Sequence, residues 1–215
     1  MLYDIHTHHP APYPQGVVSA VPEADFSPSP GQFYSLGLHP WQSGESSAEA
    51  IVELIERYAS EPWLAAVGEC GVDPLKGAPM YRQMLLFRRQ VEIAEKARKP
   101  MVIHAVRSPD IILGIRKDLG ARQNWAIHGF RGKSTVAQMY LRAGIYLSFG
   151  ERYNPDSLLS MPRGYILAET DESSLSIEEI IALHAATLQM SVAEYRALIA
   201  ANTSRFLGVA EWMSK

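Results

Sequence analysis

Cysteine is almost absent from this sequence, and long hydrophobic runs are absent altogether. Of 215 residues only Cys70 is a cysteine, so no disulfide can form within the chain, which is typical of a reducing compartment. No apolar stretch is long enough to cross a membrane, and the first residues lack the basic-then-apolar pattern of a signal peptide. We therefore expect a cytoplasmic protein that does not engage a membrane.

Positive charge is missing from the first quarter of the chain. Seven acidic residues precede the first basic one, Arg57, although the formal net charge is only −3. Between Lys76 and Arg163 the balance reverses, with sixteen Lys or Arg against six Asp or Glu, a local excess of ten positive charges. Charges on helices are usually solvated faces, so the basic residues on loops are the ones that bear on function.

Short apolar runs bounded by turn residues recur along the chain, and several are followed by amphipathic helical patterns, which is typical of βα units and a parallel sheet. Eight runs are expected as strands: Leu2–His6, Gly16–Val21, Gln32–Leu38, Leu64–Glu69, Pro100–His104, Asn124–His128, Ile145–Phe149 and Tyr165–Glu169. Eight parallel strands predict an α/β fold, a closed (β/α)8 TIM-like barrel, as one domain over residues 1–215.

Helical patterns are missing from the first part of the chain. The two segments that join the first three predicted strands, residues 8–15 and 22–31, contain three prolines each, so neither is expected to form a helix. Helices are expected later, over Ser47–Ser60, Met80–Arg98, Pro109–Leu119, Lys133–Ala143, Asp156–Ser160, Ser176–Gln189, Ser191–Ala201 and Ser204–Met213. The barrel is therefore predicted to be distorted and trimmed, with helices reduced or missing around the first two strands.

Polar residues end several of the predicted strands, where (β/α)8 barrels carry their functional groups. In the first strand Asp4, His6 and His8 alternate, so we expect them to point the same way. The later strand ends add Glu69, His104, His128 and Asp171. A lone histidine in such a place is more often a hydrogen-bonded rim residue. Six such positions on five strands favour a shared site: His6, His8, Glu69, His104, His128 and Asp171.

Imidazole nitrogens and carboxylate oxygens together suit a divalent metal such as zinc, manganese, magnesium or iron. Six ligands exceed what a single four-coordinate ion needs, which predicts two divalent metal ions bridged by a carboxylate and by a water or hydroxide. Glu69, in the middle of the set, is the expected bridge.

Sequence fragments in a fixed order extend the pattern over the whole chain: Asp4-Ile-His6-Thr-His8, Gly37-Leu-His39-Pro40, Gly68-Glu69-Cys-Gly71-Val-Asp73, Ile103-His104, Ile127-His128-Gly-Phe130, Ser148-Phe-Gly150, Glu169-Thr-Asp171 and Asn202-Thr-Ser-Arg205-Phe-Leu-Gly208. Together they resemble the TatD-type metal-dependent hydrolases of the amidohydrolase superfamily. The resemblance implies a distorted (β/α)8 barrel that typically hydrolyses nucleic-acid phosphodiesters.

Position by position, the resemblance implies that His6, His8 and Asp171 hold one ion, that His104 and His128 hold the other, and that Glu69 bridges them. The chain departs from the family pattern in its short length and in two loops. Glu-Ser-Ser-Leu follows Asp171, where the family commonly has a proline and an aromatic, and Gly-Phe-Arg-Gly follows His128, where many members have Cys-Phe-Ser-Gly. The chemistry is therefore better defined than the substrate.

Several residues are expected around the metals. Asp171 is the candidate to assist the attacking water, as a ligand that also accepts a proton, and Glu69 shares the catalytic role. Candidate substrate contacts are His39, Lys76, Arg107, Arg131, Lys133 and Arg152, all near strand ends, where polar loops are also ordinary. Trp41, Phe130 and Tyr153 are interpreted either as stacking platforms for bases or as loop anchors. His184, within a helix, is expected on the surface.

The functional hypothesis is a two-metal hydrolase that uses a metal-activated hydroxide to cleave phosphodiester bonds, a deoxyribonuclease of the TatD type. Its expected partner is a nucleic acid, DNA in single-stranded or frayed form, or another phosphate-bearing substrate. One alternative keeps the metals but hydrolyses a carboxylic ester, amide or lactone, in a small molecule or an aminoacyl ester. A third hypothesis is a non-catalytic binding protein that retains the barrel, which the complete ligand set disfavours.

Overall fold

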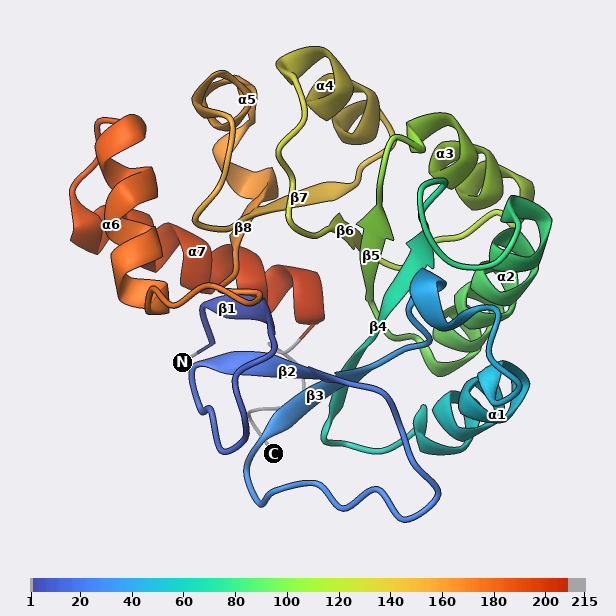
Figure 1. Ribbon diagram of the computed structural model, residues 1–215. Helices are drawn as coiled ribbons and strands as arrows, with labels where there is room; N and C mark the ends of the chain where they lie inside the picture. Colours follow the sequence, from blue (N-terminus) through green and yellow to red (C-terminus); the bar gives the residue numbers. More distant parts are fainter. Residues whose placement is uncertain (1, 209–215) are drawn as a thin grey trace.

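Eight parallel strands close into a barrel in the computed structural model, which describes residues 2–208 (Figure 1). The strands are β1 (Asp4–Thr7), β2 (Gly16–Ala20), β3 (Phe33–Leu36), β4 (Leu64–Val72), β5 (Met101–Ala105), β6 (Trp125–Ile127), β7 (Tyr146–Phe149) and β8 (Ile166–Ala168). Each strand pairs with its neighbours in the chain, and β1 also pairs with β8. The prediction of a (β/α)8 barrel is confirmed.

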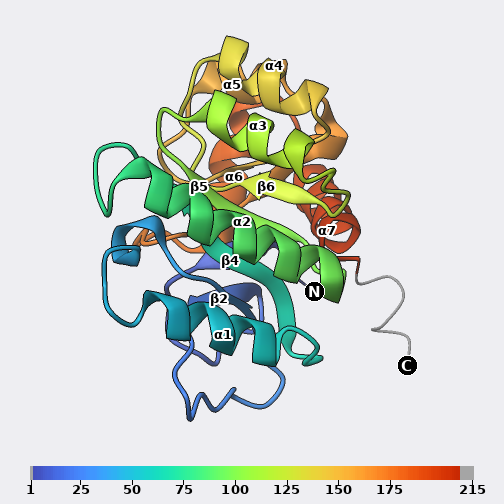
Figure 2. The ribbon, with the colours of Figure 1, turned by 90° about the vertical axis from the view of Figure 1, so that its right-hand side faces the viewer.

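Helices surround only part of this barrel. They are α1 (Ala48–Tyr58), α2 (Met80–Ala97), α3 (Pro109–Asp118), α4 (Ser134–Arg142), α5 (Pro155–Ser160), α6 (Ile177–Thr187) and α7 (Val192–Leu207), with short 3-10 turns at Pro40–Gln42 and Arg163–Tyr165. As predicted, loops alone join β1 to β2 and β2 to β3 (Figure 1). Figure 2 shows α1 and α2 side by side on the outside of the barrel. None of the helices in the described part of the chain is long and apolar enough to span a membrane.

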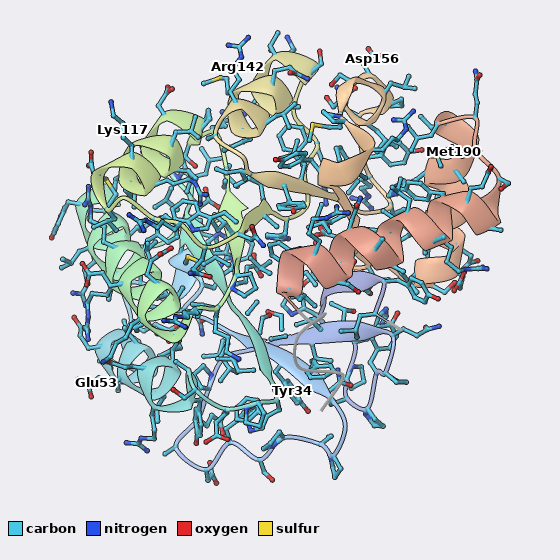
Figure 3. All side chains as sticks on the ribbon, turned by 180° about the vertical axis from the view of Figure 1, so that it is seen from behind. Tyr34, Glu53, Lys117, Arg142, Asp156 and Met190 are labelled. Carbon is cyan, nitrogen blue, oxygen red and sulfur yellow. The ribbon has the colours of Figure 1, made fainter. Side chains whose placement is uncertain are left out.

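An aromatic cluster takes the place of a helix outside β3. The ring of Phe26, from the loop between β2 and β3, lies 5.2 Å from that of Tyr34 and 5.4 Å from that of Trp63. Tyr58, at the end of α1, completes the cluster at 5.6 Å from Trp63. The loop is also tied to Tyr34, labelled in Figure 3, because the Ser29 amide donates to its hydroxyl oxygen at 3.1 Å. Four aromatic rings, packed edge-on or tilted against one another, thus lie where the connection between β2 and β3 has no helix.

The interior of the barrel is filled with apolar side chains toward the amino-terminal ends of the strands. They are Leu2, Ile5, Val17, Ala65, Ala66, Val102, Ala126, Tyr146 and Leu167, closed by Phe206 and Leu207 of α7. The histidines and carboxylates described in the next subsection lie at the opposite, carboxyl-terminal end of the strands, called the mouth below.

The final helix is longer than the sequence predicted. Two helices were expected, Ser191–Ala201 and Ser204–Met213, but α7 runs without a break from Val192 to Leu207, so the division was wrong. The Asn202 side chain donates to the backbone oxygens of Arg163 and Ile166, at 2.7 and 2.8 Å. These tertiary bonds hold a residue of low helix propensity inside the helix. Residues 209–213 of the predicted second helix lie outside the described residues.

His184 was expected on the surface, and that expectation was wrong. The residue is fully buried in α6. Its Nε2 lies 3.0 Å from the backbone oxygen of Gly150, which can only accept, so Nε2 carries the proton and donates it. Nδ1 then accepts from the Tyr195 hydroxyl at 3.2 Å. Burial lowers the pKa of His184 to about 4, so the ring is neutral in the folded protein near pH 7.

This buried histidine makes stability depend on pH. Its folded-state pKa of about 4 lies below the ordinary 6.5, so its contribution is complete above pH 6.5 and is lost as the pH falls toward 4. We expect the free energy of unfolding to fall by about 3 kcal/mol from this group over that range. Chemical denaturation at several pH values should show that the free energy of unfolding of the His184→Gln variant depends less steeply on pH than that of the wild type.

Tyr195→Phe is the matched control, because it removes a bond to His184 but leaves a buried imidazole. It should lose some stability at every pH and keep the wild-type pH dependence. An unchanged dependence in His184→Gln would contradict this assignment.

Candidate metal centre

Glu69 is the centre of the polar cluster at the mouth. It lies on β4 with only 8% of its surface exposed, and five imidazole nitrogens surround its two carboxylate oxygens. Those near Oε1 are His128 Nε2 at 2.7 Å, His104 Nδ1 at 2.8 Å and His39 Nε2 at 3.0 Å; those near Oε2 are His6 Nε2 at 3.4 Å and His8 Nε2 at 3.5 Å. The two oxygens therefore face two different sets of histidines.

Two glycines of β4 allow this crowding. Gly68 and Gly71 flank Glu69 and Cys70 and have φ values of 150° and 142°, which side-chain-bearing residues rarely adopt. A Cβ at Gly68 would clash with the backbone oxygen of Val102, and one at Gly71 with that of His104. The two glycines thus let β5 approach β4 closely enough for His104 to reach Glu69.

Asp171 joins the set that faces Glu69 Oε2. Its Oδ1 lies 3.7 Å from Nε2 of both His6 and His8. The backbone fixes this arrangement, because the Asp171 amide donates to the His6 oxygen and the His8 amide donates to the Asp171 oxygen, each at 3.0 Å. Asp171 has a φ of 53°, in the left-handed region, which is a common feature of functional positions.

Asp4 does not join the cluster, contrary to the expected alternation along β1. The pairing of β1 with β2 shifts its register between Asp4 and Thr7, which breaks the alternation. Asp4 is fully buried, and its oxygens accept from the Thr170 amide at 3.1 Å, the Thr170 hydroxyl at 2.6 Å and the His6 amide at 3.2 Å. Asp4 therefore ties β1 to the residue that precedes Asp171.

Two further carboxylates, Asp73 and Glu169, lie outside the predicted set of six. Each contacts a histidine at the ring nitrogen that faces away from Glu69. Asp73 Oδ2 lies 3.4 Å from His104 Nε2 and accepts from the indole of Trp41 at 2.7 Å. Glu169, fully buried, has Oε1 3.6 Å from His128 Nδ1, and this oxygen accepts from the Gly129 amide. Both follow apolar runs in the sequence, which is the signal that could have identified them.

Opposing effects set the charge state of the cluster. Burial acts to raise the pKa of Glu69, but His128, His104 and His39 hold that pKa well below its usual value. Burial acts to lower the pKa of His128, but Glu69 and Glu169 raise it well above its usual value. The pKa of Asp171 is also lowered, because His6 and His128 outweigh the effect of burial. The carboxylates of Glu69 and Asp171 are thus ionised, and their charge is balanced by protons on the imidazoles or by cations bound between them.

An unpaired buried ring nitrogen favours cations. Within the described residues, Nε2 of His6 is buried and has no hydrogen-bond partner, although Glu69 Oε2 and Asp171 Oδ1 lie 3.4 and 3.7 Å from it. Such groups are rare in folded proteins unless something else satisfies them. Four overlapping groups of three ligand atoms lie within 4.8 Å of one another: His6, Glu69 and His128; His6, His8 and Asp171; His39, Glu69 and His104; and His128, Glu169 and Asp171. This donor set fits divalent metal ions.

Three cavities open at the mouth, with volumes of about 380, 170 and 590 Å³, and Asp171 lines all of them. Of the predicted basic contacts, Arg107 and Arg131 line the largest cavity, and Arg152 lines the smallest together with Arg131. The Nζ atom of Lys76 lies 3.4 Å from the centre of the Trp41 ring. Lys133 precedes α4 and lines none of the three.

The three candidate stacking residues differ in what they can do. Trp41 is 45% exposed at the mouth. Phe130 is only 6% exposed and packs edge-on against Tyr140 and Phe149. The Tyr153 hydroxyl bonds to Thr187 Oγ1 at 2.7 Å, which makes this residue a loop anchor. Trp41 alone of the three presents a half-exposed ring.

Fold and cluster together define a (β/α)8-barrel protein with a candidate metal centre at its mouth. The chain belongs to the family described as TatD related DNase, whose model matches residues 26–208, so the resemblance seen in the motifs is confirmed. The crystal structure of YjjV, a TatD homologue from Escherichia coli K12, matches with a TM-score of 0.82 over 95% of this chain and 96% of that one. At 19% identity this match concerns the fold.

Curated proteins that are similar to this chain align with only part of its length and of their own. The uncharacterized metal-dependent hydrolase YabD of Bacillus subtilis is 28% identical over 148 residues, which cover 65% of this chain and 58% of YabD. The 3'-5' ssDNA/RNA exonuclease TatD of Klebsiella pneumoniae is 28% identical over 151 residues, covering 66% and 57%. The chain thus spans about three fifths of the length of the curated relatives it matches.

The buried Asp4 supplies a test of how the centre is held together. Asp4→Ala removes the acceptor for three buried donors, and we expect it to lower the free energy of unfolding by about 3 kcal/mol. Asp4→Asn retains Oδ1, which accepts both amide protons, and should lose less than half as much. Urea denaturation measures both. Equal losses in the two variants would show that Asp4 does not act through these bonds.

Proposed function

We propose that this protein is a two-metal hydrolase that cleaves phosphodiester bonds, a deoxyribonuclease that acts on single-stranded or frayed DNA. The observation that carries the proposal is the division of histidines between the two oxygens of Glu69. A carboxylate with imidazoles on both of its oxygens is placed to bridge two cations, and membership of the family supports the same chemistry.

The proposed ligands follow from the distances. His6, His8 and Asp171 would hold one cation next to Glu69 Oε2, and His104 and His128 the other next to Oε1. His39 is near enough to Oε1, at 3.0 Å, to serve as a further contact at the second position. The donors are mixed nitrogen and oxygen, so zinc, manganese, magnesium and iron all fit.

When bound, two divalent cations would lower the pKa of a water molecule and neutralise charge that develops on a phosphoryl oxygen. The chain supplies the rest of the chemistry. Asp171 has an ionised carboxylate, and it lines all three cavities, so it is placed to accept a proton from the attacking water. Asp73 and Glu169, behind His104 and His128, would fix the ring orientations.

Substrate class follows from the charges beside the centre. Arg107, Arg131 and Arg152 lie on the loops after β5, β6 and β7, on one side of the mouth. Guanidinium groups next to a phosphodiester centre favour a chain with further phosphates. Trp41 offers a face on which a base can stack, which favours unpaired strands.

The Glu69→Ala variant tests the two-metal proposal. Removing the carboxylate between the two proposed cations should lower the rate of cleavage of single-stranded DNA by about a thousandfold or more. This corresponds to a loss of about 4 kcal/mol of transition-state stabilisation. Elemental analysis should show fewer bound ions per chain than in the wild type, and circular dichroism should show an intact fold.

Cys70→Ala is the matched control, since it changes the neighbouring buried residue of the same strand, whose thiol donates a weak hydrogen bond to the Val102 oxygen at 3.8 Å. It should retain metals and activity. An active Glu69→Ala variant would refute the two-metal mechanism.

One observation favours a second candidate function. The cavity of about 380 Å³ has no Lys or Arg among the described residues that line it, which would suit a neutral ester, amide or lactone. Nitrophenyl carboxylic esters and bis(nitrophenyl) phosphate separate the two functions, with EDTA-treated protein as the control. We expect metal-dependent hydrolysis of the phosphodiester. Turnover of the carboxylic esters alone would replace the nuclease proposal with the ester hydrolase.

A further inference from the structure

Trp41, on the loop after β3, makes two hydrogen bonds to residues of the mouth. Its indole Nε1 donates to Asp73 Oδ2 at 2.7 Å, and its backbone amide donates to His39 Nδ1 at 3.2 Å. The Nζ atom of Lys76 lies 3.4 Å from the centre of the Trp41 ring, so the chain itself covers one face of the indole. The indole N–H is therefore used within the protein, and only part of the ring is free for a ligand.

Both bonds lead to histidines on the Oε1 side of Glu69. Asp73 Oδ2 lies 3.4 Å from His104 Nε2, and the other ring nitrogen of His104, Nδ1, lies 2.8 Å from Glu69 Oε1. His39 Nε2 lies 3.0 Å from the same oxygen. Almost any residue at position 41 would make the backbone bond to His39. What tryptophan adds is the N–H that holds Asp73.

The Asp73 carboxylate is held at both of its oxygens. Oδ1 accepts from the Leu75 amide at 2.8 Å, while Oδ2 accepts from the indole of Trp41 at 2.7 Å. The backbone of Asp73 is held by Gln83 of α2, whose side chain is only 2% exposed. This side chain accepts from the Asp73 amide at 2.7 Å and donates to the Asp73 oxygen at 2.9 Å. Together these bonds set the oxygen that Asp73 presents to His104.

The loops after β3 and β4 are also joined by contacts that do not involve the indole. The Ala78 amide donates to Ser43 Oγ at 3.1 Å, and the Ser43 hydroxyl donates to the backbone oxygen of Pro40. Gly77 has a φ of 95°, and a Cβ there would clash with the Pro40 oxygen, so glycine permits the close approach. Removing the indole N–H should therefore leave both loops in place.

We propose that Trp41 is a positioning residue that supports the cation position beside Glu69 Oε1. Its indole holds the Asp73 carboxylate against His104 Nε2, so that His104 Nδ1 faces the cation. This inference rests on the proposed two-metal function and assigns to one of the two positions a residue that supports it. Carboxylates that hold the far ring nitrogen of a metal-binding histidine typically change metal affinity by about 10- to 100-fold.

The cation position beside Oε2 lacks this support. In the part of the chain that the structure describes, no hydrogen bond joins Trp41 to His6 or His8, whose Nε2 atoms face Oε2. Asp171, the third residue of that group, is held by backbone bonds to His6 and His8 instead. The two positions should therefore respond differently to a change at Trp41.

Trp41→Phe tests the inference, because it keeps an aromatic ring and removes the N–H donor. Manganese is titrated into the whole chain after EDTA treatment, and unbound Mn²⁺ is measured by electron paramagnetic resonance. The wild type should bind two ions. In the variant the affinity for one ion should fall by about 10- to 100-fold, and the affinity for the other should not change. Asp73→Asn should weaken the same ion, and the double variant should lose little more, because both changes break one contact.

Three further variants identify the ions and control for the substitution. His104→Ala should remove the ion whose affinity falls in Trp41→Phe, and His8→Ala should remove the other one. Trp63→Phe is the matched control, since it makes the same substitution in the aromatic cluster beside β3 and should bind both ions as the wild type does. Circular dichroism should show an intact fold in every variant.

Kinetics on single-stranded DNA give a second readout. In Trp41→Phe, kcat should fall at low manganese and recover at high manganese, while KM for DNA stays unchanged. A higher KM with unchanged affinity for both ions would assign Trp41 to base stacking and overturn the inference. Unchanged affinities alone, or equal weakening of both ions, would also overturn it and leave the two-metal function standing. A wild type that binds a single ion would overturn both proposals.

Discussion

One buried carboxylate surrounded by five imidazoles is the feature on which the rest of the mouth depends. Taking Glu69 and its neighbours out of water costs several kcal/mol per charge, and that cost is offset only if their partners are placed accurately. The apolar filling at the opposite end of the barrel makes this possible, because it fixes the strands that carry the partners. The cluster is therefore stable only as part of a well-packed barrel, and bound cations would complete it.

The candidate metal centre forms although the first two connections between strands contain no helix. No helix lies between β1 and β2 or between β2 and β3, and an aromatic cluster of Phe26, Tyr34, Tyr58 and Trp63 packs beside β3. The relevant strand ends stay in register because parallel pairing continues around the closed sheet. The absence of these helices affects the surroundings of the centre, however, since residues at the ends of β2 and β3 line the cavity of about 380 Å³ directly. The trimming therefore bears on substrate fit more than on the cluster.

Much of this arrangement could be predicted because strand ends in a parallel barrel meet at one place. The run that ends at His104 became β5, and the neighbouring runs brought His128 and Glu69 beside it. Predictions failed where distant parts of the chain decided the outcome. A register shift redirected Asp4, and burial against Tyr153 and Tyr195 enclosed His184. Neither effect has a signature in local periodicity.

The central claim is that the two oxygens of Glu69 separate two cation positions. Anomalous diffraction from crystals of the protein grown with manganese tests it most directly. We expect two peaks, one among His6, His8, Asp171 and Glu69 Oε2, and the other among His104, His128 and Glu69 Oε1. A single peak, or ions bound away from Glu69, would contradict the claim.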